Sequence, residues 1–273
     1  MTESNEEILR PLQRSDVPAA FQLSAQAGWN QTEEDWCTLL DLAPTSCFGI
    51  EIRGELASTT TLISYGTRLG WIGMVLTKSD FRRRGLARKL LDHSLNVADR
   101  MGIETLKLDA TDQGQPLYAQ CGFRGEHPIE RWSRPGAKTE SSSMAQTPST
   151  SWSEQDPKYF GADRIPLLKR LVQRGSPFLR NDAYLFARPG RTTAYLGPCM
   201  SPNPEDAQNL ISACVGETRY SWSWDLFPEN VNAIRIARSL GFSSHRHLLR
   251  MARGKDLTQN IEATYAIAGF ELG

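Results

Sequence analysis

A long polar segment divides the sequence near its middle. From Ser133 to Lys158 the chain reads SRPGAKTESSSMAQTPSTSWSEQDPK, which is rich in Ser, Thr, Pro and Gln and has almost no apolar residues. Such a segment cannot bury enough surface to offset the entropy that it would lose on ordering. The sequence therefore predicts an N-terminal domain at 1–134, a linker at 135–158 and a C-terminal domain at 159–273.

The N-terminal region mixes strand-like and helix-like patterns. Apolar residues recur at helical spacing over 86–98 and the pattern ends at Gly102, while the flanking segments are rich in residues that favour strands. Thr32 and Asp35 form a carboxylate version of a capping box, and Ser15 predicts a second helix start. The order of these elements indicates an α/β or α+β domain.

The C-terminal region repeats the later part of this pattern. TTAYLGPCM, YSWSWDLF and HRHLLRMAR read as strands, and PEDAQNLISACVG and NVNAIRIARSLGF read as helices between them. The endings YAQCGF and ARSLGF occupy equivalent places in the two regions. This correspondence indicates an internal duplication.

The overall composition argues against several partners. The 31 Lys and Arg residues balance 31 Asp and Glu residues, so the net charge gives no reason to expect a nucleic-acid or membrane partner. The five cysteines are scattered without a CxxC pair, and the four histidines lack metal-ligand spacing. No secretory segment or bilayer-spanning apolar run is present. We therefore expect a cytoplasmic protein without a metal site.

An arginine cluster precedes the best-defined helix. In FRRRGLARKLL, Phe81–Leu91, three arginines stand where the helix macrodipole disfavours cations. A solvated basic run is one interpretation. The other is an anion site, in which Gly85 and the small Ala87 let a ligand approach the uncapped helix start and the arginines add charge-assisted contacts. The strand before the cluster favours the anion site, and neither GxxxxGK[ST] nor GxGxxG follows a strand here.

Two motifs resemble those of the GNAT superfamily of N-acetyltransferases. Arg82-x-x-Gly85-x-Ala87 is similar to its R/Q-x-x-G-x-G/A signature, and PLYAQCGF, which contains Tyr118, is similar to its LYxxxGF element. The resemblance covers roughly residues 8–134 and includes bacterial tandem proteins whose second domain lacks the signature. It implies two GNAT-like domains, each a mixed, mostly antiparallel sheet flanked by helices, with a degenerate second domain. DATDQGQP departs from the family, which often carries an asparagine at this place.

The resemblance also implies a cofactor and its contacts. Acetyl-coenzyme A would bind the first domain only, with its pyrophosphate at the loop and its pantetheine arm along the preceding strand. The residues implied for this role are Met74, Val75, Leu76, Arg82, Arg83, Arg84, Gly85, Leu86, Ala87 and Arg88.

The catalytic groups are predicted less completely. Tyr118 is the candidate general acid for the leaving thiolate, with a packing role as the alternative. A covalent route through Cys121 lacks a neighbouring histidine in the sequence. Asp109 and Asp112 lie near the expected strand end, but an ordinary carboxylate is a poor base, so the general base stays open.

The acceptor site is the least defined part. Trp29, Glu33, Asp109 and Asp225 are the candidates for binding a small-molecule amine. We expect an N-acetyltransferase; the alternative is a non-catalytic acyl-coenzyme A-binding or interaction protein of the same fold. The sequence does not indicate the acceptor, the acyl length or the oligomeric state.

Overall fold

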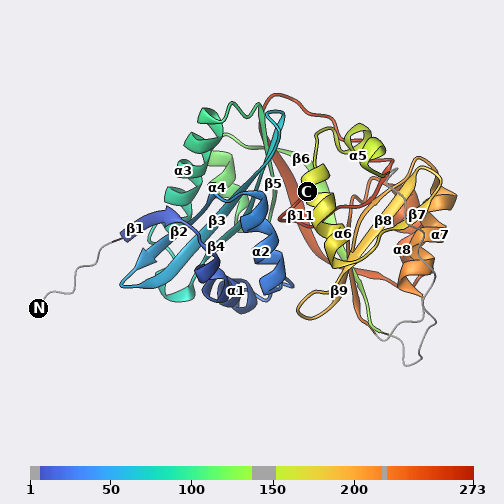
Figure 1. Ribbon diagram of the computed structural model, residues 1–273, viewed down its shortest axis with the longest axis horizontal. Coiled ribbons are helices and arrows are strands. Elements are labelled where there is room, and N and C mark those ends of the chain that lie inside the picture. The colour runs from blue at the N-terminus through green and yellow to red at the C-terminus, as the bar shows by residue number, and fades with distance from the viewer. Residues whose placement is uncertain (1–6, 137–151, 217–219) are drawn as a thin grey trace, which may run out of the picture.

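The computed structural model describes residues 7–136, 152–216 and 220–273, here called the first half (7–136) and the second half (152–273). Most of the predicted linker, 137–151, lies outside the described residues. Figure 1 shows the two halves next to each other, with strands running from one into the other.

The first half contains β1 (Glu7–Pro11), α1 (Val17–Gln26), α2 (Glu33–Leu42), β2 (Cys47–Ile52), β3 (Glu55–Tyr65), β4 (Leu69–Thr77), α3 (Leu86–Arg100), β5 (Thr105–Ala110), α4 (Gln115–Gln120) and β6 (Arg124–Arg134). Short 3₁₀ turns at Arg14–Asp16 and Ser79–Phe81 precede α1 and α3. The second half contains α5 (Trp152–Phe160), α6 (Ile165–Arg174), β7 (Phe178–Arg180), β8 (Ala183–Arg188), β9 (Ala194–Met200), α7 (Pro204–Val215), β10 (Trp222–Leu226), α8 (Val231–Ser239), β11 (Ser243–Gly254) and β12 (Thr264–Ala266).

The strands of both halves form one continuous sheet. Its order is β1-β2-β3-β4-β5-β11-β6-β10-β9-β8-β7, with β12 paired to β9. The pairs β4–β5 and β9–β10 are parallel and the others are antiparallel. β11 of the second half lies between β5 and β6 of the first half, and β6 in turn pairs with β10. The two halves therefore exchange strands rather than form separate sheets.

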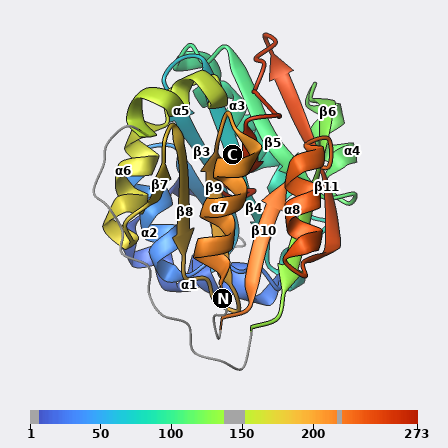
Figure 2. The ribbon, with the colours of Figure 1, turned by 90° about the vertical axis from the view of Figure 1, so that its right-hand side faces the viewer.

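Helices cover the sheet where the sequence predicts apolar faces. The predicted apolar stripe of α3 is buried throughout, and its members are Leu86, Leu90, Leu91, Leu95 and Ala98. Figure 2 shows α7 and α8 on the outer face of the second half. In the parts of the chain that the structure describes, no helix is long and apolar enough to cross a membrane.

Two local predictions need correction. Ser15 lies inside a 3₁₀ turn, and α1 begins after Asp16 without a side-chain cap. The end of the predicted linker is helix α5, because Trp152 and Phe160 are buried and Asp156 forms an ion pair with Arg164. By contrast, the capping box of Thr32 and Asp35 is present at the start of α2.

The last segment of the second half returns to the first half. After β12, the carbonyl of Phe270 accepts a hydrogen bond from Trp71 Nε1 over 2.9 Å, and that of Leu272 accepts one from the Tyr65 hydroxyl over 2.6 Å. The carbonyl of Gly273 accepts from Arg164 over 2.9 Å. These bonds fix segment 267–273 against β3 and β4, beside the candidate site.

Candidate functional site

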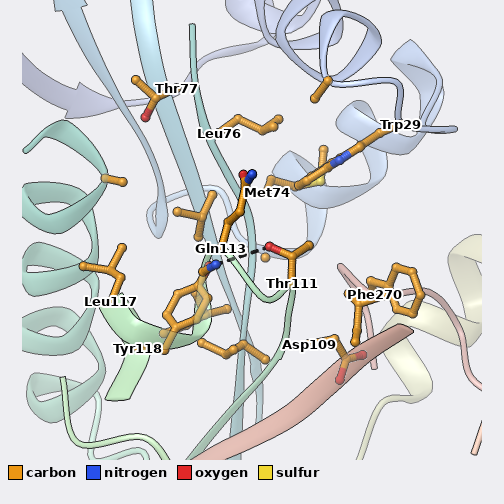
Figure 3. Close-up of a pocket in the computed structure, with 18 of the residues that line it drawn as sticks. Trp29, Met74, Leu76, Thr77, Asp109, Thr111, Gln113, Leu117, Tyr118 and Phe270 are labelled. Atoms are coloured by element: carbon orange, nitrogen blue, oxygen red, sulfur yellow. Dashed lines mark hydrogen bonds between the residues drawn. The ribbon is translucent and has the colours of Figure 1, made fainter. Parts of the chain in front are cut away.

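A cavity of about 890 Å³ lies where β4, the loop before α3 and the loop before α4 meet the second half. The first half contributes most of the wall, and β11 and segment 267–273 contribute the rest. In Figure 3, Leu117 and Tyr118 lie on one side of the cavity, and Trp29 and Phe270 lie on the other.

The arginine loop forms one end of the cavity. Gly85 is the N-cap of α3 with φ +79°, and no side chain caps the helix. A Cβ at Gly85 would meet nothing within 4 Å, so the first N–H groups of α3 are open to a ligand. Arg82, Arg83 and Arg88 line the cavity here, and Arg83 has φ +61°, a conformation that is uncommon for a side-chain-bearing residue. This loop fits the pyrophosphate of a coenzyme A group.

Arg84 differs from its predicted role. Its guanidinium lies 3.7 Å from a carboxylate oxygen of Glu7 and 5.4 Å from the ring centroid of Phe81, and the residue is not part of the cavity wall. Arg82 and Arg83, which precede it, do line the cavity. Leu86 and Ala87 line the cavity.

Strand β4 supplies the floor of the cavity. It pairs with β5 from Leu69 to Trp71, and the remainder of β4 diverges from that partner. Near Met74, which has φ +49°, the register with β3 also shifts. Met74, Val75 and Leu76 therefore line the cavity with backbone groups that β5 does not pair. Such an open strand segment can pair with an extended ligand.

Tyr118 is buried, with 9% of its surface exposed, and lines the cavity from α4. Its ring packs edge-to-face against Phe123, with 6.2 Å between ring centroids. Burial raises the pKa of Tyr118, and the nearby Cys121 adds to this shift. The hydroxyl therefore stays protonated at neutral pH, as a general acid requires.

The two aspartates predicted for acceptor binding are engaged in ion pairs between strands. Asp109 on β5 lines the cavity, but both its oxygens accept hydrogen bonds from Arg250 on β11. Asp225 accepts two hydrogen bonds of 2.6 Å from Arg131 and one of 2.8 Å from the Tyr195 hydroxyl, and it lies away from the cavity wall. Asp225 is thus a structural partner of Arg131.

Of the remaining candidates from the sequence, some line the cavity and others do not. Trp29 and Asp112 line the cavity, whereas Glu33 is exposed on the first turn of α2 and Cys121 lies outside the wall. Burial also raises the pKa of Cys121, which disfavours the thiolate that a covalent route needs.

The wall residues that sequence reasoning missed include Gln31, Arg246, Phe270 and Glu271. Glu271 is 4% exposed; its carboxylate accepts hydrogen bonds from Gln31 over 2.9 Å and from Arg188 over 3.3 Å. Burial raises the pKa of Glu271, while Arg188 opposes the shift. The sequence marks Glu271 only as a single acid in the apolar run ATYAIAGFEL.

The equivalent helix of the second half lacks an open anion site. Asn203 caps α7 by accepting a hydrogen bond from the Glu205 N–H over 2.8 Å, and Pro204 stands at the first helical position. Glu205 and Asp206 place two carboxylates in the first turn. A phosphate would meet negative charge and an occupied N-terminus there.

Comparison with known proteins matches each half of the chain to an acetyltransferase model. A model of the acetyltransferase (GNAT) family matches residues 9–123, and a model of an acetyltransferase (GNAT) domain matches residues 153–266. The chain is 28% identical over 246 residues to the uncharacterized N-acetyltransferase YitH of Bacillus subtilis, covering 85% of this chain and 86% of that one.

Solved structures show the same fold over nearly the whole chain. A putative acetyltransferase from Pyrococcus horikoshii has a TM-score of 0.86 at 20% identity, covering 100% of this chain and 98% of its own. A tandem GNAT protein from the clavulanic acid biosynthesis pathway has a TM-score of 0.61 at 14% identity, covering 93% and 100%. These similarities confirm the predicted tandem arrangement and the mixed sheet flanked by helices.

Proposed function

Because the chain belongs to the GNAT family of acetyltransferases, we propose that it transfers an acetyl group from acetyl-coenzyme A to the amine of a small molecule. The observation that carries this proposal is the cavity itself, which joins the uncapped start of α3 to an acceptor end walled by Trp29 and Phe270. Acetyl-coenzyme A supplies a thioester, whose C–S bond breaks as the new C–N bond forms. The amine loses one proton, and the departing sulfur gains one.

In this proposal the arginine loop binds the anionic end of the cosubstrate. Arg82 and Arg83 supply charge, and the open N–H groups of α3 supply hydrogen-bond donors. Arg88 also lines the loop, although it forms an ion pair with Asp92 on the next turn of α3. The backbone of β4 from Met74 to Leu76 binds the extended arm.

Tyr118 is the proposed general acid. An ordinary phenol is a weaker acid than a thiol by about 1.5 pKa units, so proton donation is slightly uphill in water. Burial raises the pKa of Tyr118 further. The same burial would also raise the pKa of a thiol in this cavity, which limits the gap between the two pKa values. A carboxylate with a raised pKa, Glu271, lines the acceptor end and can accept the amine proton.

The direct test is release of free thiol from acetyl-coenzyme A in the presence of a library of small amines. An acetyltransferase releases one thiol for each amine acetylated. If coenzyme A binds but no amine, tested at millimolar concentration, accelerates thiol release above the rate of spontaneous hydrolysis, the alternative of a non-catalytic binding protein is correct.

A further inference from the structure

Arg246 is an unpaired cation at the acceptor end of the cavity. It lies on β11, opposite Arg131 on β6, and lines the cavity wall. Its guanidinium carbon is 6.0 Å from the ring centroid of Trp29 and 5.8 Å from that of Phe270. Among the residues that the structure describes, none forms a hydrogen bond or an ion pair with this guanidinium. Burial and the charge of Arg131 lower its pKa, and the charge of Asp225 opposes this shift.

The neighbouring arginines of the same strands are neutralised. Arg131 is held by two hydrogen bonds to Asp225, and Arg250 by two to Asp109. Arg246 differs from both in that no carboxylate of the described residues lies within hydrogen-bonding or ion-pair distance of its guanidinium. A partly buried guanidinium without a partner is costly unless a ligand supplies the anion, and a carboxylate matches its planar donors.

An acidic group that can bind the cationic end of a ligand lies on segment 267–273, beside β4. A Cβ on Gly73 would come within 3.0 Å of the Glu271 Cα, so Glu271 lies directly against the strand residue that precedes Met74. Gln31 donates its Nε2 to the Glu271 carboxylate, and its buried Oε1 has no hydrogen-bond partner among the described residues. One carboxylate, which Arg188 also contacts over 3.3 Å, and one free acceptor oxygen thus meet in this corner. Together they suit the N–H groups of an ammonium ion.

We propose that the acceptor is a primary amine that carries a carboxylate, as a free amino acid does, with its carboxylate bound by Arg246 and its amine held by Glu271 and Gln31. This inference rests on the proposed acetyltransferase function. The ammonium N–H bond breaks as its proton passes to the Glu271 carboxylate, and the freed nitrogen lone pair can then attack the thioester. Phe270 links the two binding ends in the chain, because its ring centroid lies 5.8 Å from the Arg246 guanidinium carbon and it directly precedes Glu271.

The test compares three acceptor classes: free amino acids, the matching amino acid amides, and simple alkyl amines. Thiol release gives KM and kcat for each, and calorimetric titration into the protein with coenzyme A gives binding without turnover. Arg246→Gln should raise KM and Kd for the preferred amino acid about tenfold to hundredfold, as loss of a charged hydrogen bond does. For the amide of that amino acid, the same substitution should change KM and Kd less than threefold. Arg246→Lys should restore part of the affinity.

Arg238→Gln is the matched control. Arg238 is exposed on α8 and also lies 6.0 Å from a tryptophan ring centroid, that of Trp132, but it is outside the cavity wall. This variant should keep the parental KM. Amines without a carboxylate that match or exceed amino acids as acceptors, or an Arg246→Gln variant that affects acid and amide equally, would overturn the inference while leaving acetyl transfer intact. Carboxylate-dependent binding without any thiol release would instead support Arg246 and refute the proposed function.

Discussion

Arg250 on β11 donates hydrogen bonds of 2.8 and 2.9 Å to the two carboxylate oxygens of Asp109 on β5, and both side chains are fully buried. The pair joins strands from different halves of the chain at the place where the halves exchange strands. Arg250 also donates a hydrogen bond to Gln259 over 2.8 Å and lies 4.6 Å from the ring centroid of Trp71. The ion pair is thus a structural link between the two halves.

Removing one partner of this pair should strongly destabilise the protein. Arg250→Met leaves the Asp109 carboxylate buried without a cation, which typically costs about 3–5 kcal/mol. Urea unfolding followed by circular dichroism measures the loss. The double variant Asp109→Leu with Arg250→Met should recover most of it, because no uncompensated charge remains. Arg235→Met, at an exposed position on α8, is the control. A loss below about 1 kcal/mol for Arg250→Met would contradict the argument.

Local features of the fold could be predicted because they depend on neighbours in the sequence. The apolar face of α3 and the capping box at Thr32 follow from helical spacing and from side-chain chemistry within one turn. The insertion of β11 between β5 and β6 could not be predicted, because an alternating strand pattern does not specify its partners.

Residues of the candidate site could likewise be predicted only where they belong to a local sequence motif. Gly85 and Tyr118 stand in sequence motifs, and the structure places both on the cavity wall. Glu271 and Arg246 reach that wall through the exchange of strands and the returning segment 267–273, so no local pattern marks them. Asp225 was a candidate for acceptor binding, but an acid in an apolar strand can also serve as the partner of a distant arginine. Here that arginine is Arg131.

Gly85→Asp should abolish coenzyme A binding. The parent should bind one coenzyme A per chain in calorimetry, because the uncapped N-terminus of α3 opens into the cavity, whereas Asn203 caps the equivalent helix α7. The aspartate would place a side chain and a negative charge where phosphates are expected to bind. Gly66→Asp is the matched control, since Gly66 has φ +69°, equally open surroundings and a position outside the cavity. Two sites per chain, or equal affinity in both variants, would refute this prediction.

Tyr118→Phe should lower kcat and spare cofactor affinity. The substitution keeps the buried ring and removes only the hydroxyl, so a positioned general acid predicts a loss of about 10²-fold, at the lower end of such effects. Tyr265→Phe is the control, because Tyr265 is 1% exposed and lies outside the cavity. A kcat within about threefold of the parent would mean that the hydroxyl contributes less than ~0.7 kcal/mol to lowering the barrier. A parallel collapse of affinity would instead identify Tyr118 as a packing residue.

The stability of the protein should decline at alkaline pH, in part through Tyr118. An unfolded chain releases a tyrosine proton near pH ~10. Burial raises the pKa of Tyr118 in the folded protein, so the folded state keeps this proton to higher pH. The contribution of the protonated Tyr118 phenol to folding stability is therefore complete below pH ~10 and is lost as pH rises toward the folded-state pKa. Urea unfolding at roughly pH 9 to 11 gives the free energy of unfolding, which should decline with pH less steeply in Tyr118→Phe than in the parent. Equal slopes would contradict burial of the phenol.

Gly73→Ala should disturb the acceptor end of the cavity more than the cofactor end. A Cβ on Gly73 would stand 3.0 Å from both the Cα and the carbonyl oxygen of Glu271, so the added methyl meets backbone that hydrogen bonds hold in place. Overpacking of this kind typically costs about 1–3 kcal/mol and shifts the neighbouring segment. Because Glu271 belongs to the proposed amine site, the KM for the acceptor should rise several-fold while coenzyme A affinity stays within about twofold. Gly125→Ala separates this effect from a general response to an added methyl group, because its Cβ would meet the Leu249 side chain at 2.9 Å, which can rotate away. If both variants gave the same acceptor KM, the close approach of β4 and Glu271 would have no part in placing the amine.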